Sequence, residues 1–288
     1  DFLRLGERIE PWSFVIALIG EGQEIHIGEE SGLPQWNDAL ASMHEPWVVH
    51  CPEKIASQFD AAAQIEKNDV LDLTVTLRSH LAEDVATWIQ AVLNRDLGMA
   101  RELAQRVSAQ GFDMYLTNNL ILAQEYVKER YRDQEDKRYG LIASSKAKNL
   151  PDYGIHNEFN FTKNMREGPW YNDPPRSPWS CCALRDVATE FSCQGLELDF
   201  PIICWGNDMR WVDGEWKTPR VTRLNKARDP HQLRINSYRV LLSRGRDGFI
   251  VFVPPESQMA ETYAILQAAG MRQLDKAVII PTHSTAYS

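Results

Sequence analysis

The sequence predicts an α/β fold with a mainly parallel sheet flanked by helices. Apolar runs of strand length recur along the chain, at residues 14–20, 112–117 and 249–253 among others. Segments of helical periodicity separate them, and between residues 85 and 93 apolar side chains recur at spacings of three and four. Strands that alternate with helices are typical of a parallel sheet, because each crossover needs room for a helix.

Local signals place several further elements. Asn118 and Asn119 are both expected to be able to cap a helix over residues 120–131, and residues 231–242 read as another helix. Asp213 and Gly214 sit between short apolar segments and predict a hairpin turn. Residues 150–180 contain five prolines and many polar side chains, so we expect an irregular insertion there.

Composition narrows the class of protein. The chain has 288 residues, of which 43% are hydrophobic and 25% charged, which suits one large or two smaller globular domains. It contains no apolar run long enough for a membrane helix, so we expect no membrane partner. Five cysteines and seven histidines show no metal-ligand spacing, which predicts no bound metal and a reducing, cytoplasmic compartment.

Charge is unevenly distributed. The formal net charge is −9, which argues against a general coat for nucleic acid. Residues 205–248 nevertheless hold ten basic and five acidic side chains. Such a segment indicates either a local site for phosphates or a solvated charged face, and charge alone does not separate the two.

Two segments place a polar or charged side chain at or just after the end of an expected strand. Residues 14–20 finish at Gly20 and are followed by Gln23, whose amide both donates and accepts hydrogen bonds. Residues 73–79 contain Arg78 at the end of an expected strand, and a guanidinium is a permanently charged fork that matches phosphate oxygens. The alternatives are a glycine turn and an arginine paired with a neighbouring carboxylate.

A third segment, residues 191–199, forms an expected strand-to-helix turn. It carries Ser192, Gln194, Gly195 and Glu197. A turn at the start of a helix leaves backbone N–H groups available to an anion. The alternative is a capping turn in which Glu197 faces a helix dipole.

A fourth segment, residues 237–246, places Arg239 and Arg244 on a helix that leads into the strand at residues 249–253. Two arginines five residues apart lie about 140° apart on a helix, so one of them can be structural. The alternative is a basic helix end that complements the helix dipole.

Taken in order, the four segments resemble motifs III, IV, V and VI of superfamily-one helicases. The stretch from about Phe14 to Pro254 is similar to the Schlafen-like DNA/RNA helicase domain family. The resemblance implies a RecA-like fold of the P-loop NTPase type. It also implies roles for the residues of the four segments. Catalysis would use Arg244, Arg239, Gln23 and Arg78; nucleotide binding would use Gly20, Gln23, Arg78, Glu197 and Arg244; nucleic-acid binding would use Ser192, Gln194 and Gly195.

The resemblance also implies that part of the protein is missing. No Gly-x-x-x-x-Gly-Lys-Ser/Thr run occurs, and no Asp-Glu pair follows an apolar strand, although these elements hold ATP phosphates and Mg²⁺ in the family. We therefore expect a C-terminal fragment that is inactive alone. Residues 1–65 would be the tail of a first RecA-like domain, whose missing part is the expected partner, and residues 66–288 the second domain.

The predicted function is the C-terminal part of an ATP-dependent DNA or RNA helicase or translocase, with ATP and Mg²⁺ as cofactors of the full-length protein. Arg244 would be the arginine finger, which contributes roughly 10³–10⁵ in rate in related enzymes. One alternative is a nucleic-acid-binding or regulatory domain that does not hydrolyse ATP. Another is an unrelated α/β hydrolase or nuclease, which the arginines at positions 78 and 244 disfavour.

Overall fold

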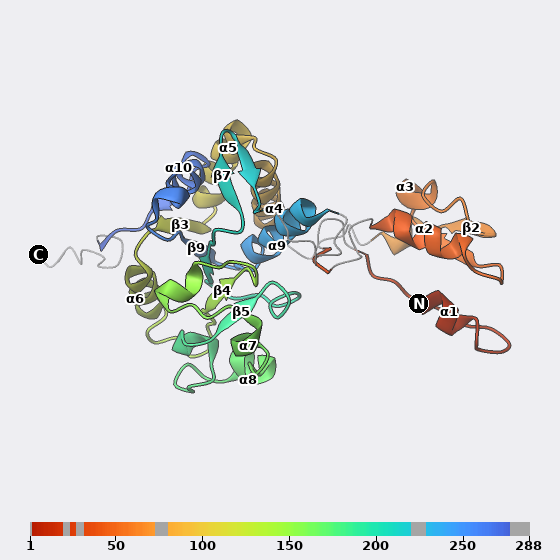
Figure 1. Cartoon of the computed structure of the whole chain (residues 1–288), viewed down its shortest axis with the longest axis horizontal. Helices are drawn as coiled ribbons and strands as arrows, with labels where there is room; N and C mark the ends of the chain where they lie inside the picture. Colours follow the sequence, from red (N-terminus) through yellow and green to blue (C-terminus); the bar gives the residue numbers. More distant parts are fainter. Residues whose placement is uncertain (1, 20–23, 27–31, 73–79, 220–228, 277–288) are drawn as a thin grey trace, which may run out of the picture.

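The computed structural model describes residues 2–19, 24–26, 32–72, 80–219 and 229–276. Its larger part is built on a six-stranded sheet in which every pairing is parallel, in the order β10-β3-β9-β6-β4-β5 (Figure 1). The strands are β3 Asp113–Thr117, β4 Leu141–Ala143, β5 Val187–Thr189, β6 Ile202–Cys204, β9 Gly248–Phe252 and β10 Arg272–Gln273. The predicted α/β class with a parallel sheet is confirmed, and it is consistent with a RecA-like fold.

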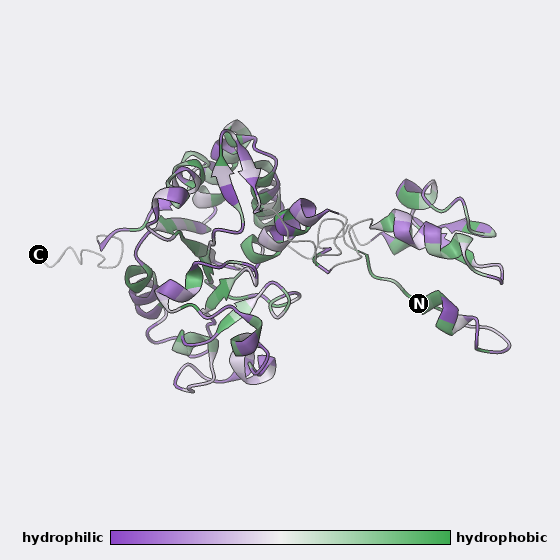
Figure 2. Ribbon diagram, viewed as in Figure 1, coloured by the Kyte–Doolittle hydropathy of each residue, from purple (hydrophilic) through white to green (hydrophobic). Residues whose placement is uncertain are grey.

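Helices flank this sheet. They are α4 His80–Leu93, α5 Leu97–Ala109, α6 Leu120–Arg130, α9 Pro230–Leu242 and α10 Ala260–Ala268. The apolar stripe predicted for residues 85–93 is buried, and α4 packs against α5 and α9. Figure 2 shows hydrophobic strands in the interior and hydrophilic stretches on the outer helices. None of the described helices is long and apolar enough to cross a membrane.

Helix caps fix where two of these helices begin. Of the two predicted capping residues, Asn119 is the cap: its Oδ1 atom accepts a hydrogen bond from the Leu122 backbone N–H at 3.1 Å, whereas the Asn118 Nδ2 atom donates to the Val253 carbonyl. The Asp229 Oδ1 atom accepts from the Gln232 N–H at 2.9 Å, and Pro230 occupies the first position of α9. These caps set the start of α9 and hence the positions of the side chains it carries.

The predicted hairpin is present as β7 Arg210–Val212 paired antiparallel with β8 Glu215–Lys217. Asp213 and Gly214 have φ values of 52° and 85°, as a two-residue turn of this hand requires. Trp216 is buried, and its indole Nε1–H donates to the Val92 carbonyl at 3.0 Å. This bond fastens the hairpin to the last turn of α4.

The expected insertion contains several short helical turns. They are η2 Leu150–Tyr153, α7 Phe159–Thr162, α8 Glu167–Asn172 and, just beyond it, η3 Cys181–Ala183. Trp170 is 1% exposed, and the Tyr171 hydroxyl donates to the Glu197 carbonyl at 2.9 Å. The insertion is therefore packed on the body, which proline content alone could not indicate.

The described residues 2–19 and 32–72 have a hydrophobic cluster of their own, whereas Ile25 is buried in the core of the larger part. Their elements are α1 Phe2–Gly6, α2 Leu33–Ala41, β1 Val48–Cys51, α3 Glu53–Ala56, β2 Gln64–Lys67 and η1 Asp69–Leu71. The strands β1 and β2 form a two-stranded parallel sheet. The domain boundary predicted after residue 65 stays a prediction, and β2 runs past it.

The buried strand predicted at residues 14–20 is wrong for its described part, residues 14–19. This segment forms no strand, and Phe14, Ile16 and Leu18 are 71%, 73% and 83% exposed. An extended segment becomes a strand only when a neighbour takes up its backbone N–H and C=O groups. The apolar content of a segment indicates that it tends to be buried, but it does not indicate whether a neighbouring strand is present to pair with it.

Candidate functional site

Polar side chains gather where three neighbouring strands end. Ser144 follows β4 directly, Glu190 follows β5 directly, and Asp208 lies a few residues beyond β6. Because these strands are parallel and adjacent, their carboxyl ends share one edge of the sheet. This edge is where ligands bind in open α/β folds.

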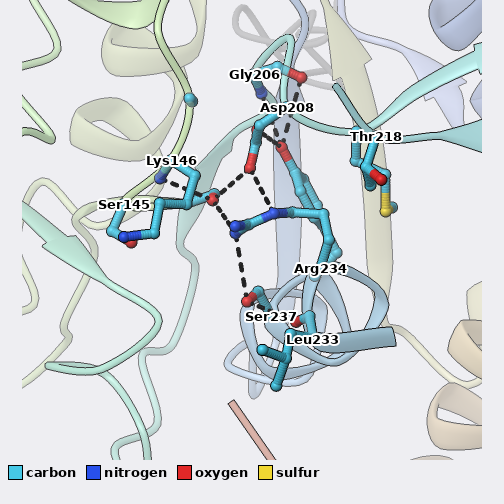
Figure 3. Close-up of polar contacts among 12 residues, drawn as sticks. Ser145, Lys146, Gly206, Asp208, Thr218, Leu233, Arg234 and Ser237 are labelled. Atoms are coloured by element: carbon cyan, nitrogen blue, oxygen red, sulfur yellow. Dashed lines mark hydrogen bonds and ion pairs between the residues drawn. The ribbon is translucent and has the colours of Figure 1, made fainter. Parts of the chain in front are cut away.

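Arg234 of α9 is at the centre of this cluster (Figure 3). Its Nε atom lies 3.0 Å from Asp208 Oδ2, and its Nη1 atom lies 2.7 Å from Ser144 Oγ and 3.5 Å from Glu190 Oε1. The Arg234, Glu190 and Asp208 side chains are 12%, 1% and 5% exposed. Buried carboxylates are tolerated when they are paired and hydrogen-bonded, so the guanidinium holds the loops after β4, β5 and β6 together.

Tyr238, one helical turn after Arg234, extends the network. Its hydroxyl donates to Asp208 Oδ1 at 2.8 Å and accepts from the Gly206 N–H at 3.0 Å. Burial, reinforced by the charge of Asp208, raises the pKa of Tyr238 well above its usual value. The hydroxyl therefore stays protonated and remains a donor to Asp208.

The loop after β4 is fixed through its backbone. Glu190 accepts hydrogen bonds from the Ser145 N–H at 2.7 Å and the Ser145 hydroxyl at 3.1 Å. Asn157 is fully buried, and its Nδ2 atom donates to the carbonyls of Ser144 and Ala147 at 2.6 and 2.9 Å. Lys146 is left on the outside, with its side chain exposed. The network thus presents a rigid loop that points a lysine to solvent.

Gly206 allows the loops after β4 and β6 to touch. A Cβ atom built on Gly206 would lie 2.1 Å from the Ala147 Cβ atom, far inside van der Waals contact. Only a residue without a side chain fits at this approach.

We expect Gly206→Ala to lower the free energy of unfolding by about 1–3 kcal/mol, because overpacking must displace a loop of the network. Adding Ala147→Gly removes the colliding methyl group and should restore part of the loss. Gly168→Ala is the matched control, since nothing lies within 4 Å of its added Cβ. Urea unfolding compares these variants with the wild-type chain, and a Gly206→Ala protein as stable as the control would contradict the expectation.

Arg244, the predicted finger, lies just beyond the other end of α9. It is 4% exposed, and its Nη1 atom donates to the carbonyls of Leu196 and Cys193 at 3.0 and 3.3 Å. Its Nε atom donates to the Val240 carbonyl at 2.9 Å. The guanidinium therefore joins the end of α9 to the turn at residues 193–196, which bears predicted nucleic-acid-binding residues.

The backbone reinforces this junction. Leu198 N–H donates to the Arg244 carbonyl at 2.8 Å, and Arg246 N–H donates to the Leu198 carbonyl at 2.9 Å. The Arg246 guanidinium also lies 3.6 Å from the Glu197 carboxylate. The two segments predicted to form motifs V and VI are thus side by side, although the sequence separates them by about 40 residues.

The remaining predicted residues of these segments lie around the same turn. Gln194 and Gly195 are exposed and Ser192 is partly exposed. Gly195 has a φ of 83°, which favours glycine, and no atom lies within 4 Å of the Cβ it lacks. Arg239 is half-buried and donates to Asn236, and burial lowers its pKa. The structure therefore leaves the tip of the turn accessible while its base is clamped by Arg244.

Gly20, Gln23 and Arg78 lie outside the described residues. The segment just after Gln23 is described and lies against the larger part. Asn236 of α9 donates to the Glu24 carbonyl at 2.9 Å, and the His26 ring lies 5.0 Å from that of Phe191.

Comparison with protein families matches residues 4–255 to the family described as "Schlafen group 3, DNA/RNA helicase domain". The match spans most of the chain and includes every residue of the network and of the Arg244 junction. The chain belongs to this family. Comparison with curated proteins and with solved structures gives no match.

Sequence reasoning missed the network at the carboxyl edge of this Schlafen-family domain. No local pattern in the sequence distinguishes Arg234, Asp208, Glu190 or Ser144 as members of one site. A signal was available, since Glu190 follows a buried strand and Arg234 falls in the basic segment. In the structure the Ser144 hydroxyl donates to Asp208 at 2.6 Å and accepts from Arg234, which is a structural use.

Proposed function

We propose that this chain is the nucleic-acid-facing and phosphate-facing half of an ATP-dependent DNA or RNA helicase or translocase. Family membership supports a helicase domain in general. One observation carries the finer proposal. The arginine proposed to face the transferred phosphate, Arg244, holds the turn at residues 193–196, which is proposed to contact nucleic acid.

This junction suggests how ATP would be coupled to grip on a strand. To reach a phosphate, the Arg244 guanidinium must turn away from the carbonyls of Cys193 and Leu196. That movement would release the turn that carries Gln194 and Gly195. A ligand shifts an equilibrium only by its differential affinity for the two states, and a phosphate that competes with two carbonyls provides such a difference.

We propose that some of the described residues contribute one part of an ATP site. Arg244, Arg239 and Glu197 lie near the end of α9, where arginines could stabilise phosphate charge. Among the residues that the structure describes, no group of three or more His, Cys, Asp or Glu side chains could hold a metal ion. In the proposal, Mg²⁺ and the β- and γ-phosphates are held by another RecA-like domain, with Gln23 and Arg78 at the shared cleft.

Residues 2–72 support the existence of such a partner. A two-stranded parallel sheet is marginal in isolation, and parallel sheets are normally covered on both faces. The exposed apolar side chains of Phe14, Ile16 and Leu18 are suited to burial against further strands. We infer that additional polypeptide completes a first RecA-like domain around this part.

A non-hydrolysing nucleic-acid-binding or regulatory domain is the second candidate. The burial of Arg244 favours it, because a guanidinium bonded to backbone carbonyls is a stable structural arrangement.

The chain by itself is expected to show no ATP turnover, with or without added DNA or RNA, because no phosphate-binding loop occurs in its 288 residues. A coupled assay that detects phosphate release measures this directly. The matched test uses the full-length protein that contains this chain. Turnover there supports the helicase proposal, whereas nucleic-acid binding without turnover supports the second candidate. Turnover by the chain alone that Arg244→Ala abolishes would contradict the division of labour between domains.

A further inference from the structure

Aromatic side chains project from the insertion beside the network. Phe159 and Phe161 of α7 are 76% and 57% exposed. The His156 ring stacks on Phe161 with centroids 4.6 Å apart and an interplanar angle of 19°. Phe159 and Phe161 are two residues apart, so their side chains leave the helix axis in directions about 200° apart. Phe159 and the Phe161–His156 pair therefore offer two separate ring faces.

The buried side chain of Asn157 ties these aromatics to the loop after β4. Its two hydrogen bonds to the Ser144 and Ala147 carbonyls place residues 156–158 directly against that loop. The helix α7 also lies against β5. The aromatics therefore belong to the same carboxyl edge of the sheet as the network around Arg234.

Two exposed lysines share this edge. Lys146 and Lys148 stand on the loop that Asn157 and Glu190 hold in place, and among the described residues neither forms an ion pair. Residues 144–167 contain four basic and three acidic side chains in a chain whose net charge is −9. The local balance is thus positive where the chain as a whole is acidic.

We propose that the α7 surface, defined as His156, Phe159, Phe161, Lys146 and Lys148, binds single-stranded nucleic acid. The aromatic rings would stack on unpaired bases, and the two lysines would lie along the phosphates. This combination of ring faces with an adjacent cationic loop is how proteins bind single strands without reading sequence. The inference rests on the proposed function, because it names the nucleic acid that the same domain would take.

A duplex does not suit this surface. The base faces that a phenyl ring can stack on are covered by neighbouring pairs in a duplex and are open in a single strand. The buried anchors Asn157 and Glu190 fix the spacing between rings and lysines, so the surface needs no folding step when it binds. We therefore expect a preference for single strands of either DNA or RNA.

Fluorescence anisotropy with this chain tests the proposal. The probes are a labelled dT 20-mer, a labelled U 20-mer and a labelled 20-base-pair DNA duplex. The wild-type chain should bind both single strands more tightly than the duplex. Phe159→Ala with Phe161→Ala should weaken single-strand binding by roughly 10-fold or more, given typical losses on removing a stacking ring. Phe159→Tyr with Phe161→Tyr keeps both rings and should retain binding.

A double variant of the two lysines tests the proposed phosphate contacts separately from the stacking of the rings. Lys146→Ala with Lys148→Ala should weaken binding and flatten its dependence on salt, since fewer counterions are released. Lys128→Ala is the control: it is an exposed lysine on α6, close to Arg130, which pairs with Asp113 at the opposite edge of the sheet. Circular dichroism spectra of all variants are compared with that of the wild-type chain to check that each variant is folded.

The outcomes are distinct. If single-strand binding is lost in Phe159→Ala with Phe161→Ala (the alanine pair) and kept in Phe159→Tyr with Phe161→Tyr (the tyrosine pair), the α7 surface is supported as the binding site. Wild-type affinity in the alanine pair, with binding lost on replacing Gln194 and Ser192 by alanine, overturns the α7 surface and leaves the proposed function standing. An equal loss in the tyrosine pair, or a preference for the duplex, also overturns the inference. No binding of any probe by the wild-type chain overturns both proposals.

Discussion

Replacing Arg244 with lysine in the full-length protein is expected to lower kcat for ATP hydrolysis by about 10³-fold or more, while ATP binding changes little. Lysine keeps the charge but loses the planar fork, so it cannot contact two oxygens in a fixed geometry. The same loss of geometry applies to the carbonyls of Cys193 and Leu196. An interaction made mainly in the transition state should appear in kcat rather than in the dissociation constant.

Arg246→Lys is the matched control for this prediction. Arg246 is two residues away, its side chain is 56% exposed, and its pairs with Glu197 and Asp199 are 3.6 and 3.7 Å long. Exposed pairs of this kind contribute little, so turnover should stay within about fivefold of wild type. Steady-state kinetics and a thermal melt are measured for both variants. Wild-type turnover in Arg244→Lys, or equal losses in the two variants that follow a lower Tm, would rule out the catalytic role.

Replacing Asp208 with alanine is expected to lower the free energy of unfolding by about 3–5 kcal/mol, which is the usual cost of removing one partner from a buried ion pair. Asp208 is 4% exposed and contacts Arg234, Ser144 and Tyr238. Without it, Glu190 at 3.5 Å remains as the acidic partner of the Arg234 guanidinium. The Tyr238 hydroxyl would also lose its shorter hydrogen bond and be left with the Gly206 carbonyl at 3.5 Å as an acceptor.

Denaturant unfolding of three variants makes this prediction specific. Asp208→Asn keeps an acceptor for Tyr238 and should lose less stability than Asp208→Ala. Asp186→Ala removes an exposed carboxylate that lies immediately before β5, and it should be close to neutral. If Asp208→Ala costs no more than Asp186→Ala, the network does not hold the strand ends together.

The helix α9 links the two regions that these predictions address. Arg234 near its start belongs to the network at the carboxyl edge, and Arg244 just beyond its end clamps the turn at residues 193–196. The eight residues of α9 that follow Arg234, up to Leu242, span about 12 Å, over which a straight helix moves as one rigid body. Asn236 between them also bonds to the segment after Gln23. We expect α9 to carry movement between nucleotide and nucleic acid.

The sequence by itself determined the class of fold and many of its elements. Helical periodicity predicted the buried stripe of α4, and Asp213 with Gly214 predicted the hairpin, because both signals depend on neighbours a few residues apart. The order of the four motif segments predicted the family. The resemblance of residues 237–246 to motif VI points to Arg244 without any knowledge of its partners.

Tertiary structure decided which of these residues meet. The network forms because β4, β5 and β6 are neighbours in the sheet, which brings together Ser144, Glu190, Asp208 and Arg234. Local periodicity predicts single strands but does not predict their order in the sheet. The partners of Arg244 are backbone carbonyls, which every residue possesses, so no side-chain pattern could reveal them. The segment at residues 14–19 is a further example. Its apolar side chains predict a strand, but a strand forms only where a neighbouring strand pairs with its backbone, and local sequence does not show that neighbour.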